Sequence, residues 1–257
     1  MYSWPRLKHR GTLTGFEGPE GICVDKAQDV YIVDYDAQDI FEYAHGGTTP
    51  IRTLSETFGA GIGCSIDPQT GNLAVTDYQS PTNGPGNVLI YGRASGTPTQ
   101  YAVSNVTYPF LPAYDEHGNL FVDGDTADGP VALAELPKGG AAFEPIGLSQ
   151  SISYAGGFQW DGVHLAVGDQ TNDVIYQFAI SGSQAKEVGQ TALGGAAHVF
   201  DFFITAKDKR EKSAAVVGAD INGNRVLSWR YPAGGAPVKT IGAGLTFPQG
   251  VAISRHI

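Results

Sequence analysis

Five aspartates stand at the ends of short apolar runs, and their regular recurrence raises the possibility of a metal site. They are Asp34, Asp77, Asp125, Asp169 and Asp220. Hard cations such as calcium take several carboxylate oxygens as ligands. An aspartate that ends a strand can equally accept backbone N–H bonds in the following turn, and this would recur by repetition alone. We interpret the five residues as structural, and a divalent cation such as calcium stays the one cofactor candidate.

Three further residues are candidates for catalysis: Glu20, His198 and Asp201. A His–Asp pair can act as a general base and the group that orients it, if water or a nucleophile is aligned beside them. The chain has no Gly-x-Ser-x-Gly motif, which argues against a serine hydrolase. It also has no His-x-Glu, His-x-His or His-x-x-x-His pair, which argues against a zinc site.

The elements that position these residues are short strands in a repeating order. Runs rich in Val, Ile, Tyr and Phe, bounded by Gly, Asp, Asn and Pro, predict strands. The clearest repeat spans residues 18–54 and contains four such runs. The aspartate that ends the second run recurs after 43 residues between Asp34 and Asp77, and after 51 residues between Asp169 and Asp220. This is the period of a four-stranded propeller blade.

The fold class that we predict is all-β: a single domain over residues 1–257, a six-bladed β-propeller of four-stranded antiparallel blades. The last blade is shared, because residues 1–15 resemble the third and fourth strands of a blade whose first strand, 250–254, lies at the C-terminus. Sharing closes the ring and removes exposed sheet edges. No second-strand sequence is present for this blade. Either the blade has three strands or the natural chain extends beyond these residues, and the second alternative is our expectation. The expected blades cover about 16–54, 58–104, 106–149, 150–193, 196–244, and 245–257 with 1–15.

In a meander blade, the start of the first strand and the end of the second strand lie on one face, around the central channel. A concave site lined by every blade is the usual place for a ligand. The residues expected at the channel are Glu20, Ile62, Phe110, Gly156, Phe200 and Gln249, of which only the first is acidic. Aromatic surface here would suit sugar rings, peptides or a protein partner. The ligand-binding candidates are Glu20, Tyr108, Phe110, Tyr154 and Gln249.

Three segments carry a family resemblance. The patterns Pro-x-Gly-Ile-x-Val-Asp at 19–25, x-Val-Tyr-Ile-Val-Asp at 29–34 and x-x-Ile-Phe-Glu-Tyr at 38–43 resemble the NHL repeat. That resemblance covers essentially the whole chain and implies a six-bladed propeller, a fold that serves many functions. The rhythm is more distantly similar to gluconolactonase-like and YWTD propellers. Glu17-Gly18-Pro19 resembles the entrance at which gluconolactonase-like enzymes bind a catalytic metal through the Glu, which makes Glu17 and Asp34 metal-ligand candidates. The Asn ligands of that family have no clear counterparts here.

Composition and charge exclude several classes of partner. The net charge of −10 and the pI of about 4.9 argue against nucleic acid, whose phosphates require a basic patch. No stretch approaches 18 consecutive apolar residues, so we expect no membrane span. The first 15 residues lack the apolar region of a signal peptide. The run of mixed charge at 207–212 is predicted to be a solvated hairpin turn. We expect a monomer.

Two cysteines, Cys23 and Cys64, fall in corresponding inner strands of neighbouring blades. They are either two small buried hydrophobic residues or one disulfide between adjacent strands, which would indicate an oxidising compartment. A periplasmic or secreted location, with the export signal outside these residues, is the expectation.

Two functions follow from these patterns. The first is a non-catalytic scaffold that binds a small molecule, sugar, peptide or protein at the channel mouth, and the absence of a catalytic cluster in the sequence favours it. The alternative is a lactonase- or esterase-like hydrolase or lyase that uses a divalent metal. Its residues would be Glu17 or Glu20, Asp34, His198 and Asp201.

Overall fold

The computed structural model describes residues 1–56, 59–205 and 214–255, and this part of the chain consists almost entirely of strands and turns. Its one helical element is a 3-10 turn, η1 (Gly92–Ala94). In the same residues no helix is long and apolar enough to cross a membrane. The charged run predicted to form a hairpin turn, 207–212, lies outside the described residues.

Strands β3 to β22 form five antiparallel meanders of four strands each, which we call units 1 to 5. Unit 1 consists of β3 (Pro19–Val24), β4 (Val30–Asp34), β5 (Asp39–Tyr43) and β6 (Arg52–Ser55). Unit 2 consists of β7 (Gly61–Ile66), β8 (Leu73–Gln79), β9 (Pro85–Tyr91) and β10 (Thr99–Tyr101). Unit 3 consists of β11 (Tyr108–Tyr114), β12 (Leu120–Asp125), β13 (Val131–Leu136) and β14 (Glu144–Leu148).

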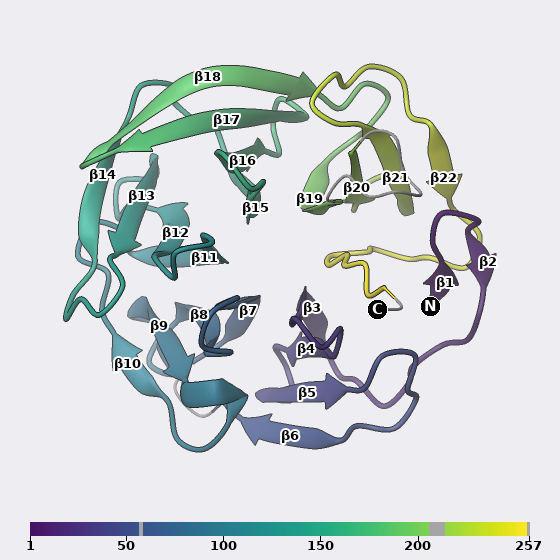
Figure 1. The fold of residues 1–257 in the computed structure, drawn as a ribbon, viewed down its shortest axis with the longest axis horizontal. Coiled ribbons are helices and arrows are strands. Elements are labelled where there is room, and N and C mark those ends of the chain that lie inside the picture. Colours follow the sequence, from purple (N-terminus) through teal and green to yellow (C-terminus); the bar gives the residue numbers. More distant parts are fainter. Residues whose placement is uncertain (57–58, 206–213, 256–257) are drawn as a thin grey trace.

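Unit 4 consists of β15 (Ala155–Trp160), β16 (Leu165–Asp169), β17 (Val174–Ser181) and β18 (Gln184–Ala192). Unit 5 consists of β19 (Val199–Ile204), β20 (Ala215–Asp220), β21 (Arg225–Arg230) and β22 (Lys239–Ile241). Figure 1 shows the units arranged around a common centre, with the first strand of each unit nearest to it. Units 3 and 4 are also joined at their outer edges, where β14 pairs with β18 in parallel. The sequence did not predict this pairing.

The two ends of the chain lie between units 5 and 1 (Figure 1). The N-terminus forms a hairpin of β1 (Tyr2–Ser3) and β2 (Lys8–His9), where the third and fourth strands of a shared blade were predicted. Residues 250–254, predicted as a first strand, form no strand. The first strand of every unit pairs with the second. That partner is missing here, so the segment has no ladder to join.

The second strands β8 and β12 send alternate side chains to the two units beside them, as the pleat of a strand requires. In β8, Leu73 and Val75 belong to the apolar cluster shared with unit 1, whereas Ala74 belongs to the cluster shared with unit 3. In β12, Leu120 and Phe121 divide in the same way between units 2 and 4. All four junctions between consecutive units bury a cluster of this kind. Burial on both faces therefore holds the units together.

A disulfide joins Cys23 of β3 to Cys64 of β7, with the two Cα atoms 5.7 Å apart. These inner strands approach closely because Gly21 has no side chain: a Cβ there would lie 2.5 Å from the carbonyl oxygen of Ile62. The bond links units 1 and 2 across a sequence separation of 41 residues.

We predict that reducing this disulfide destabilises the protein. Closing a loop of this length restricts the unfolded chain and contributes roughly 2–4 kcal/mol. The midpoint of urea unfolding should therefore move to lower urea when dithiothreitol is added. The double variant Cys23→Ala/Cys64→Ala is the control, since its midpoint should not respond to the reductant. Identical midpoints for the wild-type protein with and without reductant would contradict the prediction.

Candidate functional site

The first strands carry their channel residues on bulges. In all five units the pairing of the first strand with the second shifts register near the start of the first strand. A bulge leaves a residue unpaired and re-aims its side chain. The residues inside the bulges include Glu20, Ile62, Phe110, Gly156 and Phe200, which are the positions that the aligned repeats placed at the channel. The same backbone irregularity therefore positions the site in every unit.

Aromatic rings from three units lie on this face. Phe110 of unit 3 and Phe200 of unit 5 are in edge-to-face contact, with ring centroids 5.1 Å apart. They can meet although unit 4 stands between them, because unit 4 has Gly156 at the equivalent position. The ring of Tyr78 stacks on that of Tyr108, with the ring centroids 5.3 Å apart. The result is an apolar lining with phenol hydroxyls, suited to a flat or partly apolar ligand.

Two carboxyl groups contact one stretch of the C-terminal segment. The Glu20 side chain is hydrogen-bonded to Gln249, and Asp201 Oδ2 accepts the backbone N–H of Val251 at 3.4 Å. Burial raises the pKa of Glu20 to about 7, with the Gln249 bond opposing the change and Asp36 adding to it. Burial likewise raises the pKa of Asp201 to about 7, opposed by the N–H groups of Phe202 and Val251. Both groups therefore exchange protons near neutral pH, which is what general acid–base catalysis requires.

The third catalytic candidate, His198, lies elsewhere on this face. Its ring is 6.3 Å from that of Tyr154, and its backbone N–H donates to Asp220 Oδ1. Among the described residues no hydrogen bond or ion pair joins His198 to Asp201. The structure therefore brings Glu20 and Asp201 to a common segment but leaves the predicted His–Asp pair unformed.

A further buried carboxyl escaped the sequence analysis. Asp123 in β12 is fully buried, and its Oδ1 accepts the N–H of Leu111 at 2.9 Å. Its Oδ2 has no hydrogen-bond partner within the described part of the chain. Burial raises the pKa of Asp123 well above its ordinary value, and the charges of Asp125 and Asp201 add to this effect. In the aligned repeats Asp125 is the aspartate at the end of the strand. Asp123, two positions before it, was therefore not predicted as a site residue.

Three of the five recurring aspartates accept hydrogen bonds from backbone N–H groups in the segment that precedes their unit. Asp34 accepts the backbone N–H groups of Glu17 and Gly18 at 2.9 and 2.7 Å, and Asp220 accepts those of Ala197 and His198. In unit 4, Asp169 accepts the N–H groups of Ser153 and of the following turn. These contacts agree with a structural role for the three residues.

In unit 2 a glutamate, rather than the recurring aspartate, accepts the backbone N–H groups at the start of the unit. Glu56, which follows β6, accepts the N–H groups of Gly59 and Gly61 at 3.1 Å each. Asp77 then lies buried beside Glu56. Burial raises the pKa of Asp77 far above its ordinary value, and the charge and hydrogen bond of Glu56 raise it further, while Asn87 lowers it. Asp77 therefore stays protonated in the folded protein at neutral pH.

The metal-ligand candidates do not form a metal centre. Both oxygens of Asp34 are engaged by backbone N–H groups, and Glu17 is exposed. Over residues 1–56, 59–205 and 214–255 no three His, Cys, Asp or Glu side chains are grouped so that they could hold an ion. The donor set therefore does not fit a divalent metal.

Comparisons with known proteins give a likeness of fold. No protein-family model and no curated protein matches the chain. Among solved structures, a luciferin-regenerating enzyme superposes with a TM-score of 0.67 at 16% sequence identity, covering 93% of this chain and 81% of that one. The likeness implies a propeller fold. Together with the five four-stranded antiparallel units, this likeness indicates an all-β fold of propeller type.

The protonated Asp77 predicts a specific dependence of stability on pH. Its pKa is raised in the folded state, so the folded protein keeps a proton that the unfolded chain has released, and the free energy of unfolding falls as pH rises. In the Asp77→Asn variant this side chain does not titrate, so its free energy of unfolding does not fall with pH for this reason. The melting temperature of the variant relative to wild type should therefore increase between about pH 5 and about pH 8. Asp128→Asn, in an exposed turn, is the control and should show a constant difference. A constant difference for Asp77→Asn as well would refute the prediction.

Proposed function

We propose that this chain is a six-bladed β-propeller hydrolase that acts on a small ester or lactone at its channel mouth. In this proposal β1, β2 and residues 249–255 belong to the sixth blade. The observation that carries the proposal is the pair of carboxyl groups, Glu20 and Asp201, each with a pKa of about 7 and both held by one segment. The likeness to an enzyme of the same fold supports it.

Ester hydrolysis needs a base for the attacking water and an acid for the leaving oxygen. With both pKa values near 7, one carboxyl group can be ionised while the other keeps its proton. In the proposed reaction the ionised group takes a proton from water, and the hydroxide adds to the carbonyl carbon. The protonated group then gives its proton to the alkoxide oxygen as the C–O bond breaks. A lactone would open to a hydroxy acid, and an ester would give an acid and an alcohol.

The surroundings support a compact, partly apolar substrate. Phe110, Phe200 and Tyr108 lie on the same face as the bulges and would hold the apolar part of the substrate. The net charge of −10 disfavours polyanionic ligands and supports the expectation that nucleic acid is not a partner. The Cys23–Cys64 disulfide supports a periplasmic or secreted location.

A second candidate function is a scaffold that binds a ligand without turnover. It is favoured by Tyr154, a residue that is 43% exposed and whose ring lies beside that of His198. An exposed aromatic residue suits a sugar or a protein partner, because it offers apolar area and a hydroxyl at once.

The hydrolase proposal predicts turnover of small lactones and p-nitrophenyl esters, unchanged by a chelator. The plot of kcat/KM against pH should be bell-shaped with a maximum near about pH 7, because one carboxyl group must be ionised and the other protonated. Glu20→Gln and Asp201→Asn should each lower kcat by about 10²–10⁴-fold and remove one side of the bell. Glu116→Gln, an exposed residue in a turn of unit 3, is the matched control.

Two results would overturn the proposal. Turnover that a chelator abolishes and a divalent ion restores would assign the chemistry to a metal. Binding of these ligands without any turnover, weakened by Tyr154→Ala but not by the two carboxyl variants, would establish the scaffold instead.

A further inference from the structure

Four tyrosines from units 1 to 4 gather on the face that carries the bulges, and we call them the tyrosine cluster. In units 1 and 2, Tyr35 and Tyr78 each directly follow the recurring aspartate of the second strand. In units 3 and 4, Tyr108 and Tyr154 each stand two residues before the residue in the bulge. The two kinds of position are neighbours, because in units 1, 2, 4 and 5 the first donates its backbone N–H to the carbonyl oxygen of the second.

The members of this cluster lie close to one another and to one carboxylate. The rings of Tyr78 and Tyr108 are stacked, with 29° between their planes. Burial raises the pKa of Tyr78, and the electrostatic effects of Tyr154, Asp125, Tyr108 and Tyr35 add to the rise. Such effects fall off with distance, so the four hydroxyl groups and the carboxylate of Asp125 occupy one region. All four tyrosines are only partly buried, and Tyr154 is 43% exposed.

Unit 3 has a carboxylate where units 1 and 2 have a tyrosine. In the other four units, the residue just before the bulge residue pairs with the recurring aspartate. In unit 3 this residue is Pro109, and it pairs with Gly124. Asp125 lies one position further along and pairs with Tyr108. This shift of one residue places the carboxylate of Asp125 beside the tyrosine cluster.

The fold does not use Asp125 as it uses its counterparts. Asp34, Asp169 and Asp220 accept backbone N–H groups from the segment before their unit. Asp125 Oδ1 is buried and has no hydrogen-bond partner within the described part of the chain, and no ion pair found there includes Asp125. Burial raises the pKa of Asp125. A carboxylate that loses water without gaining a partner is stabilised by a bound cation.

A carboxylate beside several tyrosine rings suits an organic cation. The face of an aromatic ring carries partial negative charge and attracts an ammonium group, which is how quaternary ammonium ligands are recognised. The alkyl groups of such a cation also bury apolar surface against the rings. The net charge of −10 raises the local concentration of cations at the protein surface.

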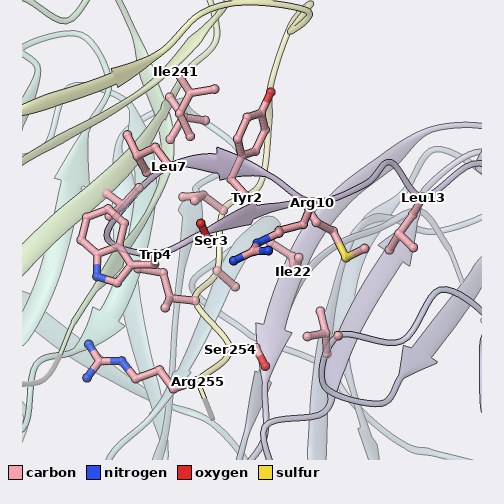
Figure 2. A pocket seen from close by; sticks show the side chains of 18 of the residues that line it. Tyr2, Ser3, Trp4, Leu7, Arg10, Leu13, Ile22, Ile241, Ser254 and Arg255 are labelled. Carbon is pink, nitrogen blue, oxygen red and sulfur yellow. The ribbon is translucent and has the colours of Figure 1, made fainter.

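The cavity of about 1300 Å³ between units 5 and 1 has the opposite electrostatic character. Figure 2 shows part of its lining, including Arg10 and Arg255. Among the described residues that line it there is no Asp or Glu, and Arg6 and Lys239 add to its positive charge. A cation is therefore expected at the tyrosine cluster rather than in this cavity.

We propose that Asp125 and the tyrosine cluster form a subsite for the alkylammonium group of a small ligand. The charged nitrogen would face the carboxylate of Asp125, and its methyl groups would contact the faces of the tyrosine rings. Binding of the cation does not depend on turnover. Where the hydrolase function proposed above also holds, on which this last step rests, the substrate would be an ester of a quaternary amino alcohol.

The test compares choline with 3,3-dimethylbutan-1-ol, a neutral molecule of the same shape, by isothermal titration calorimetry of the wild-type protein. We expect choline to bind and the neutral molecule to bind at least several-fold more weakly, because only choline carries the charge that the carboxylate and the ring faces attract. Asp125→Asn should remove most of this difference. Asp128→Asn, in an exposed turn of the same unit, is the matched control and should leave the difference unchanged.

Substitutions of Tyr78 separate the effect of the aromatic face from that of apolar area. Tyr78→Phe keeps the aromatic face and should bind choline as well as the wild-type protein does. Tyr78→Leu keeps apolar area alone and should weaken choline binding by about 2–30-fold. The melting temperature of each variant, measured alongside, shows that it is folded.

The proposal fails on any of three results: equal affinity for choline and the neutral molecule, no binding of choline to the wild-type protein at millimolar concentrations, or choline binding that neither Asp125→Asn nor Tyr78→Leu weakens. The hydrolase function is tested separately by turnover of choline acetate and of 3,3-dimethylbutyl acetate. Turnover without preference for the choline ester would refute the subsite and leave the hydrolase intact. Choline binding without any turnover would do the reverse.

Discussion

The constraint on which this structure depends is that both faces of each sheet must be covered. The central side chains of the second strands are almost completely buried, for example Val33, Leu73, Val122 and Val216. Full burial of one such side chain contributes about 1.5–3 kcal/mol. A single four-stranded sheet with apolar residues on both faces cannot achieve this burial alone, so each unit needs a neighbour on both sides. A ring is the arrangement that satisfies all units, and it brings the two ends of the chain together.

Closing the ring crowds the inner strands and thereby creates the site. Where these strands approach, the position after the channel residue is often glycine, as at Gly21, Gly63 and Gly157, because a Cβ there would collide with the next unit. In unit 5 this position is occupied by Asp201, which follows Phe200 in the bulge. A carboxyl group thus occupies a position that is glycine in three of the other four units. Burial there raises its pKa, so the unusual chemistry follows directly from the packing.

Much of this architecture could be predicted from local patterns. Strands of period two, turn residues and the recurring aspartate indicated the units, and the aligned repeats placed Glu20 and Phe110 at positions that proved to lie on bulges. Contacts between units could not be predicted in this way. The Phe110–Phe200 contact depends on a glycine in the unit between them, and the Glu56–Asp77 pair joins a linker to a strand. The prediction of a first strand at 250–254 was wrong, because a strand needs a pairing partner as well as a suitable sequence.

The carboxyl pair depends on one segment of chain that forms no strand. Gln249 and Val251 contact Glu20 and Asp201, whereas Ile253 and Ser254, a few residues on, border a cavity of about 1300 Å³ between units 5 and 1. Catalytic geometry tolerates little displacement, since an error of about 1 Å can cost a hundredfold in rate. The backbone of residues 249–254 therefore decides how precisely the two carboxyl groups are held, although it lies outside every sheet.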